Sequence, residues 1–174
     1  MLILLSNTGA SVSDTCDFPY PMEKASKRCT FSYNTHNEQQ EPYSFRWEPY
    51  DNTTNDDEKS NAEKAFLFQT QQEMNGLPYE GYITTYSGSG YIANLGTTKQ
   101  DALDVLSQLD LHKWIDQLTR AVFLEFNILN ANSNLFSLAI VVHEFTPMGS
   151  VFNWHTVDTV QLYRYTGKLR YNKQ

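Results

Sequence analysis

The chain has 174 residues, of which 40% are hydrophobic and 24 are aromatic, counting 10 Phe, 11 Tyr and 3 Trp. This length and composition predict one domain with a hydrophobic core rather than a disordered chain. The net charge of −7 argues against nucleic-acid binding, because an acidic chain does not neutralise phosphates. No apolar run approaches the roughly 20 residues of a membrane-spanning helix, and Met1–Leu5 is too short for a signal peptide.

The N-terminal part carries the signs of an extracytoplasmic protein. We expect residues 1–15 to be a disordered lead or boundary segment. Cys16 and Cys29 are separated by 12 residues and lack the further ligands of a zinc site, which leaves a disulfide or two unpaired buried thiols. Asn52 begins an N-glycosylation sequon, Asn-Thr-Thr. A cysteine pair and a sequon together favour a location outside the cytosol.

Residues 16–64 show neither helical nor strand periodicity. Up to residue 50 the segment is rich in Pro, Tyr, Ser and Asn, which predicts a loop-built region held by its aromatic side chains. Residues 51–64 (DNTTNDDEKSNAEK) are strongly polar and predict a solvated loop.

Order is expected to begin again near Ala65, and the second half of the chain is strongly patterned. Gly81–Tyr86 and Tyr91–Leu95 have strand composition and are separated by Gly-Ser-Gly, which predicts a hairpin. Thr97 or Thr98 can cap a helix that starts at Lys99. Its apolar face is formed by residues at helical spacing, namely Ala102, Val105, Leu106 and Leu109, and a second short helical piece is expected over His112–Leu118.

The last third of the chain predicts strands. Arg120–Ile128, Leu135–Phe145 and Thr156–Tyr165 alternate or are continuously apolar, and the second is apolar on both faces, which indicates a central strand covered on both sides. The predicted fold class is α+β, with a mostly antiparallel sheet of about five strands, helices packed on it and a loop region at the N-terminus.

No catalytic or metal-binding constellation stands out. Gly88-Ser89-Gly90-Tyr91-Ile92-Ala93 fits the dinucleotide pattern G-x-G-x-x-A, but a strand is expected where that motif requires a helix. The four histidines are scattered, and His143-Glu144 within an apolar strand is typical of a satisfied sheet pair. We therefore expect no enzymatic activity and no cofactor.

Three segments of the second half have distinctive sequences: YSGSGY at residues 86–91, WID followed by TRAVF at residues 114–123, and LNAN at residues 129–132. They resemble the polycystin domain, the large extracellular insert between the first two membrane helices of polycystins, in which the third segment is usually YNAN. NLF at 134–136, EF at 144–145 and LYRY at 162–165 continue the resemblance. LHKW at 111–114 and AVFLE at 121–125 are more similar to the polycystin-1-type branch than to the polycystin-2-type branch.

The resemblance covers residues 16–166 and implies that Cys16 and Cys29 form the disulfide of the family's N-terminal loop region, which would then be pinned by it. Residues 167–174 form a polar tail where the family enters its second membrane helix. The sequence is therefore expected to be an excised domain or a truncated product that does not conduct ions by itself.

The resemblance implies an extracellular assembly and gating domain that makes contacts between subunits above a channel pore. Its expected partners are polycystin-2-type channel subunits in a hetero-oligomer, on the outer side of the plasma or ciliary membrane, and it meets the membrane only through the parent protein. The candidate interface residues are Phe31, Tyr33, Tyr43, Trp47, Tyr50, Tyr86, Gly88 and Gly90. Trp114 and Arg120 are expected to be structural, and the alternative function is an ectodomain that binds a glycan, lipid or protein ligand.

Overall fold

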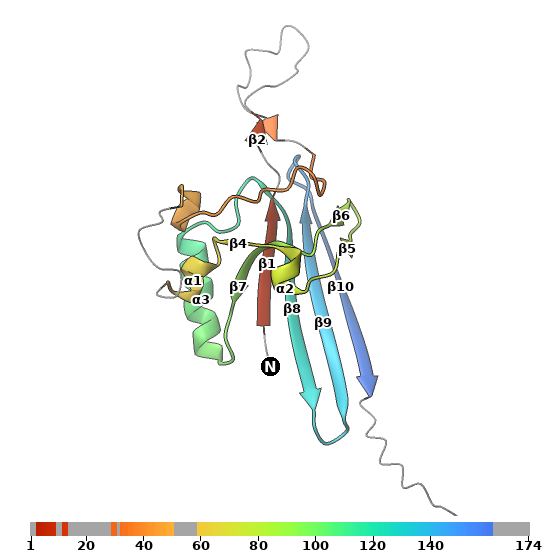
Figure 1. Cartoon of the computed structure of the whole chain (residues 1–174). Helices are drawn as coiled ribbons and strands as arrows, with labels where there is room; N and C mark the ends of the chain where they lie inside the picture. Colours follow the sequence, from red (N-terminus) through yellow and green to blue (C-terminus); the bar gives the residue numbers. More distant parts are fainter. Residues whose placement is uncertain (1–2, 10–11, 14–28, 31, 51–58, 162–174) are drawn as a thin grey trace, which may run out of the picture.

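The computed structural model describes residues 3–9, 12–13, 29–30, 32–50 and 59–161. Its centre is a six-stranded sheet in the order β10-β9-β8-β1-β7-β4, in which all neighbouring strands are antiparallel (Figure 1). The strands of this sheet are β1 Ile3–Gly9, β4 Phe68–Gln69, β7 Gly90–Asn94, β8 Thr119–Asn130, β9 Leu135–Phe145 and β10 Val151–Gln161. The architecture is α+β, as predicted.

Short elements surround the sheet. Two small antiparallel pairs join β2 (Val12–Ser13) to β3 (Cys29–Thr30) and β5 (Tyr79–Glu80) to β6 (Thr85–Tyr86). The helices of the described residues include α1 Asn61–Lys64, α2 Gln71–Met74, α3 Lys99–Leu111 and the 3-10 helix η2 Phe45–Trp47. Cys16 and Asn52 lie outside the described residues, and of Cys29 only the backbone is described, so the disulfide and the glycan stay predictions.

The first described strand differs from expectation. Ile3–Gly9 fall within the segment expected to be a disordered lead, but they form β1, which pairs with β7 on one side and β8 on the other. The expectation for these residues was wrong because the partners lie more than 80 residues away in sequence, where no local pattern reveals them. β1 is therefore an interior strand of the sheet.

The three C-terminal strands form its longest part. β9 has the predicted bounds. β10 pairs with its whole length, from Val151↔Phe145 to Gln161↔Leu135, and β8 pairs with it from Ala121↔Glu144 to Asn130↔Leu135. β10 begins five residues before its predicted start. β9 thus lies inside the sheet, although most of its side chains are only half-buried.

Helix α3 begins at Lys99 as predicted, because the Thr98 hydroxyl accepts a hydrogen bond from the Asp101 N–H. Of its predicted apolar face, Leu109 is buried and Leu106 is exposed. The second helical piece expected at residues 112–118 is absent from this described segment, which forms turns. Asp116 produces the last of these turns, because its Oδ1 accepts hydrogen bonds from the N–H groups of Leu118 and Thr119.

The predicted hairpin across Gly88 is wrong. β6 pairs back to β5, and β7 pairs with β1 and β4 in the main sheet. Gly88 is required by a close approach instead, since a Cβ on Gly88 would lie 2.6 Å from the carbonyl carbon of Gly76. A strand follows Gly90, so the dinucleotide motif has no helix on which to place a phosphate.

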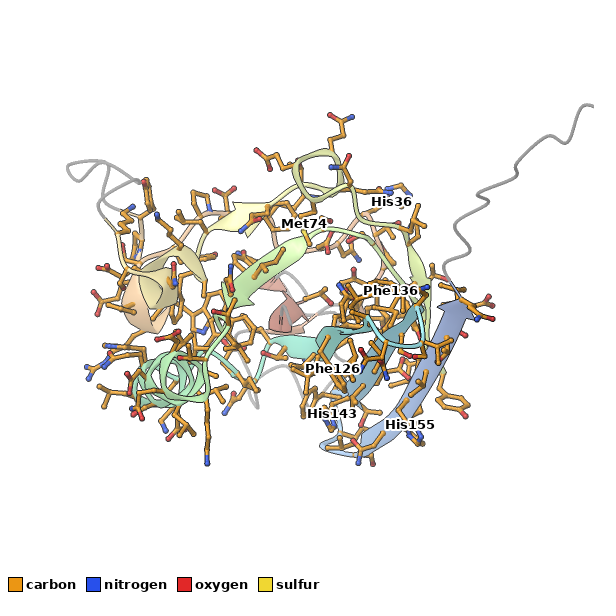
Figure 2. All side chains as sticks on the ribbon, turned by 90° about the horizontal axis from the view of Figure 1, so that it is seen from below. His36, Met74, Phe126, Phe136, His143 and His155 are labelled. Carbon is orange, nitrogen blue, oxygen red and sulfur yellow. The ribbon has the colours of Figure 1, made fainter. Side chains whose placement is uncertain are left out.

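The two faces of the sheet carry separate hydrophobic cores. The strand register places Tyr91 and Ala93 on one face, where they pack with Leu109 and Trp114 from α3 and the turn after it. Phe123 and Val142 lie on the opposite face and pack with Tyr33 and Tyr86. Figure 2 shows the two sides of the sheet, with Phe136 on one side of the strands and His143 and His155 on the other.

One end of the sheet holds both described chain ends. β1 starts and β10 finishes at the end where the β8–β9 turn lies (Figure 1). There β8 extends past the pairing of Ile3 with Phe126, so that β8, β9 and β10 form a three-stranded arm. No helix in the described part of the chain combines the length and the apolar character that a bilayer crossing requires.

Candidate interface surface

The loop that precedes η2 is attached to the sheet through a buried carboxylate. Glu38 Oε1 accepts hydrogen bonds from the Tyr33 hydroxyl (3.1 Å) and the Ser87 hydroxyl (2.6 Å), and Oε2 accepts one from Ser89 (3.0 Å). Burial, with the Glu38 charge as a second cause, raises the pKa of Tyr33 to about 12. Residues 33–38 and the YSGSGY segment are thereby joined in one polar network.

A second buried carboxylate, Glu144 on β9, holds the β5–β6 turn. Its side chain is fully buried and accepts four hydrogen bonds. Oε1 accepts from the Tyr86 hydroxyl (2.9 Å) and the Ile83 N–H (3.1 Å), and Oε2 accepts from the Tyr82 N–H (2.9 Å) and the Trp154 indole N–H (3.2 Å). Four donors compensate the cost of burying the charge, which identifies Glu144 as the anchor of this turn.

The anchored turn presents apolar side chains to solvent. Tyr82 is 76% exposed, Ile83 44% and Leu77, just before β5, 83%. The hairpin that carries them packs on the sheet through Tyr79, whose ring lies 5.4 Å from Phe123 and 5.1 Å from Trp154. An exposed apolar tip on a fixed backbone is typical of a protein–protein contact site.

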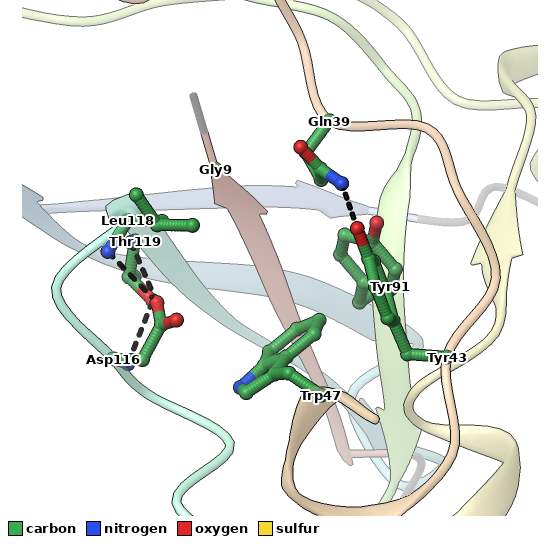
Figure 3. A pocket seen from close by; sticks show the side chains of 8 residues that line it. All are labelled: Gly9, Gln39, Tyr43, Trp47, Tyr91, Asp116, Leu118 and Thr119. Carbon is green, nitrogen blue, oxygen red and sulfur yellow. Dashed lines mark hydrogen bonds between the residues drawn. The ribbon is translucent and has the colours of Figure 1, made fainter. Parts of the chain in front are cut away.

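A cavity of about 130 Å³ lies beside the end of β1, between residues 39–47 and 116–119 (Figure 3). Tyr43, Trp47 and Tyr91 form its aromatic wall, with the Trp47 ring 5.6 Å from Tyr43 and 4.9 Å from Tyr91, both edge to face. Figure 3 shows Asp116 on the opposite side from the tyrosines, and Gln39, whose Nε2 donates to the Tyr43 hydroxyl.

The predicted interface residues are distributed between the interior and the surface. Tyr33 and Tyr86 are buried within the chain, Gly90 is buried in β7, and Gly88 is half-buried against Gly76. The remaining described aromatics, Tyr43, Trp47 and Tyr50, are half-buried. Phe31 lies outside the described residues. A single chain does not test contacts with another subunit, so the interface stays a prediction.

Trp114 and Arg120 occupy interior positions. Trp114 is 1% exposed in the core beneath α3, and its indole N–H donates to the Ala65 carbonyl at 2.8 Å. Arg120 is buried at the start of β8, where Nη1 donates to the carbonyls of Gln117 and Thr119. Burial lowers the pKa of the Arg120 guanidinium, and the charge of Asp116 opposes this shift.

Sequence reasoning missed Glu38 and Tyr82. Nothing in the local sequence distinguishes Glu38 from the exposed acids near it, because two of its partners, Ser87 and Ser89, are 49 and 51 residues away. Tyr82 was interpreted as part of a strand, and its exposure follows from the turn that replaces that strand. Glu144 was predicted to be satisfied, but its donors come from the distant β5–β6 turn and from Trp154.

Comparison with known proteins identifies the family. The family model for the polycystin domain matches residues 10–163. This chain belongs to the polycystin domain family. Mouse polycystin-1-like protein 3 is 31% identical over 143 residues, which are 82% of this chain and 6% of that protein. Human polycystin-2-like protein 1 is 37% identical over 101 residues, which are 58% of this chain and 12% of that protein.

Zebrafish (Danio rerio) polycystin-2 is 35% identical over 107 residues, which are 62% of this chain and 12% of that protein. The polycystin domain therefore spans a small part of the relatives it matches. Both branches, polycystin-1-like and polycystin-2, are among these relatives.

Proposed function

We propose that this polycystin domain is an extracellular assembly and gating domain of a polycystin-type channel complex, and that it contacts neighbouring subunits above the pore. The observation that carries the proposal is the exposed apolar tip formed by Leu77, Tyr82 and Ile83, in which Glu144 fixes the backbone of Tyr82 and Ile83. Large apolar side chains on a rigid support lose little conformational entropy on binding and commonly dominate the energy of an interface.

The arrangement of the chain ends supports an orientation. Both β1 and β10 have their outer ends at the three-stranded arm (Figure 1). If both continue into membrane helices, as the family resemblance implies, the arm end of the sheet faces the bilayer. The Tyr82 tip, which is held by Glu144 near the other end of β9, then lies away from the bilayer.

Association with a second polycystin domain tests the proposal. This chain should be monomeric or weakly self-associating at micromolar concentration, because its net charge of −7 opposes self-contact. It should bind a polycystin-2-type domain more tightly, as measured by sedimentation velocity of the two proteins alone and mixed. A tight homotetramer of this chain, or absence of any mixed complex at tens of micromolar, would contradict the heteromeric assignment.

Paired surface variants locate the contact. The double change Tyr82→Ser and Ile83→Ser removes the apolar tip and should weaken the mixed complex by about tenfold or more. Leu103→Ser is the matched control, because Leu103 is 50% exposed on α3, a helix whose core lies on the opposite face of the sheet. Equal affinity of the double variant and the control would show that the tip is not the contact.

The extracellular placement has a separate test at Asn52. Chain made in a secretory system should carry a glycan there, so peptide-N-glycosidase should increase its mobility on a gel. Asn52→Gln should run at the deglycosylated position before treatment. A wild-type band that does not change would count against the placement.

A second function, a ligand-binding ectodomain, is favoured by one observation, the aromatic cavity at Tyr43, Trp47 and Tyr91.

A further inference from the structure

The aromatic wall of the cavity offers π faces in several directions. The Trp47 ring is perpendicular to Tyr91, with an interplanar angle of 88°, and makes an angle of 74° with Tyr43. The two tyrosine rings are tilted by 46° with centroids 6.3 Å apart. Aromatic rings set at such angles around one space bind cations through the negative potential of their faces.

The remaining lining makes the cavity electronegative. Asp116 is its one charged lining residue, and the cavity has no cationic residue among those that line it. The Asp116 carboxylate accepts hydrogen bonds from the Leu118 N–H, the Thr119 N–H and the Thr119 hydroxyl, all at Oδ1, which leaves Oδ2 for a ligand. Burial raises the pKa of Tyr91 and of Tyr43, and nearby negative charge, that of Asp116 included, raises both further.

The backbone beneath Trp47 is strained. Arg46 and Trp47 have φ angles of 63° and 61°, in the left-handed region that residues with a Cβ rarely adopt. The Trp47 indole N–H donates to the Lys113 carbonyl at 2.9 Å, which fixes the ring beside the turn that carries Asp116. Strain of this kind is commonly retained where a side chain has to be held for binding.

The size of the cavity limits its ligand. A cavity of about 150 Å³ accommodates benzene, so the 130 Å³ found here fits a guanidinium or a trimethylammonium group. Gln39, Tyr43, Trp47 and Asp116 are each half-buried, so the cavity is accessible from solvent. Larger head groups would have to displace Trp47 or Tyr43.

We propose that the cavity between Trp47, Tyr43, Tyr91 and Asp116 binds an organic cation of the size of a guanidinium or trimethylammonium group, either free or at the end of a side chain. The aromatic faces contact the cation, and Asp116 Oδ2 neutralises it from the opposite side. The site is distinct from the Tyr82 tip, so it stands whether or not the tip is a subunit contact.

Titration with matched probes tests the proposal. Choline carries a trimethylammonium group, and 3,3-dimethylbutan-1-ol has the same shape without the charge. In spectra of the ¹⁵N-labelled full chain, choline should shift the Trp47 indole signal and saturate it at millimolar concentration. The uncharged alcohol should cause no saturable shift of this signal. N-acetyl-arginine amide presents the guanidinium as a side chain, and comparison with choline separates a side-chain ligand from a free ammonium compound.

Two variants test whether Asp116 and Trp47 contact the cation. Asp116→Asn keeps the Oδ1 acceptor on which the turn depends and should weaken choline binding by roughly five- to thirtyfold. Asp110→Asn, an equivalent change at an exposed residue outside the cavity, should leave affinity unchanged. Trp47→Phe should weaken binding because Trp gives the strongest cation–π contact, and it also assigns the Trp47 signal.

The indole signals of Trp114 and Trp154 report whether each variant is folded. Equal binding of choline and the uncharged alcohol, or equal affinity of the wild type and the folded Asp116→Asn variant, would overturn the proposal. So would the absence of any saturable shift with either cationic probe.

Discussion

A Cβ atom placed on Gly81 would lie 2.3 Å from Oε1 of Glu144. Glycine at this position lets the β5–β6 turn descend onto the buried carboxylate, so that the N–H groups of Tyr82 and Ile83 come within hydrogen-bonding distance of it. The hairpin is thus held on the sheet by the Glu144 carboxylate, and the absence of a side chain at Gly81 makes room for this contact.

Gly81→Ala should lower the free energy of unfolding by about 1–3 kcal/mol, because the added methyl group collides with Glu144 and Tyr86. Chemical denaturation measures the change. Thr85→Ala, at an exposed residue of the same hairpin, should change stability by less than about 0.5 kcal/mol. Equal effects of the two substitutions would show that the close approach is unimportant.

Glu144→Gln should lower the free energy of unfolding by about 3 kcal/mol. The amide NH₂ group takes the place of one carboxylate oxygen and cannot accept hydrogen bonds from the donors that face it. The substitution should also move the Trp154 indole signal, since that N–H bonds to Oε2. Glu80→Gln on the exposed side of β5 is the control. A Trp154 signal at the wild-type position in the folded variant would contradict the assigned hydrogen bond.

Stability should fall as pH rises from about 10 to about 12. Burial raises the pKa of Tyr33 to about 12 and raises the pKa values of Tyr86 and Tyr91 as well, so these folded-state groups hold protons that the unfolded chain releases near pH 10. The contribution of these tyrosines to stability is fully present below their pKa in the unfolded chain, and it is lost as pH rises through their pKa in the folded state.

Absorbance at 295 nm measures this dependence during alkaline titration. The buried tyrosines Tyr33, Tyr86 and Tyr91 should ionise only together with unfolding. Ionisation of every tyrosine near pH 10 in folded protein would contradict the assigned burial.

We predict that Cys16 and Cys29 are bonded in secreted protein and that replacing both by Ser lowers the free energy of unfolding by about 3 kcal/mol. Reductant should destabilise the wild type and leave the double variant unchanged. Mass mapping without reduction checks the bond directly, and two alkylated thiols in folded, secreted chain would refute it.

Local signals predicted the elements whose determinants are local. The bounds of β9 follow from an apolar run that starts after an Asn-rich turn, and α3 starts where the Thr98 hydroxyl caps it. Strand pairing was predicted less well, because Gly88-Ser89-Gly90 has the composition of a hairpin turn whether or not the flanking strands pair. β6 pairs with β5 instead, and β7 pairs with β1.

The interface residues stay a prediction, but the structure shows that two of them, Tyr33 and Tyr86, are buried within the chain. Tyr33 was a candidate as an aromatic residue of the N-terminal loops and Tyr86 as part of the segment around Gly88, and neither feature distinguishes a residue that fills a core from one that faces a partner. Glu38 and Glu144 hold the segments that contain these tyrosines, and they accept hydrogen bonds from groups about 50 to 60 residues away, which local sequence does not reveal. Tyr82 becomes exposed only because Glu144 fixes the turn beneath it.

The interior position of β1 has a consequence for synthesis on the ribosome. β1 is translated before the other strands of the described sheet, but its partners are Tyr91–Asn94 and the segment Thr119–Phe126. The sheet therefore cannot close until the chain has grown past Phe126, and until then the apolar segment at the start of the chain has no partner strand. Nascent polycystin domains should bind chaperones through this segment and release them after β8 emerges.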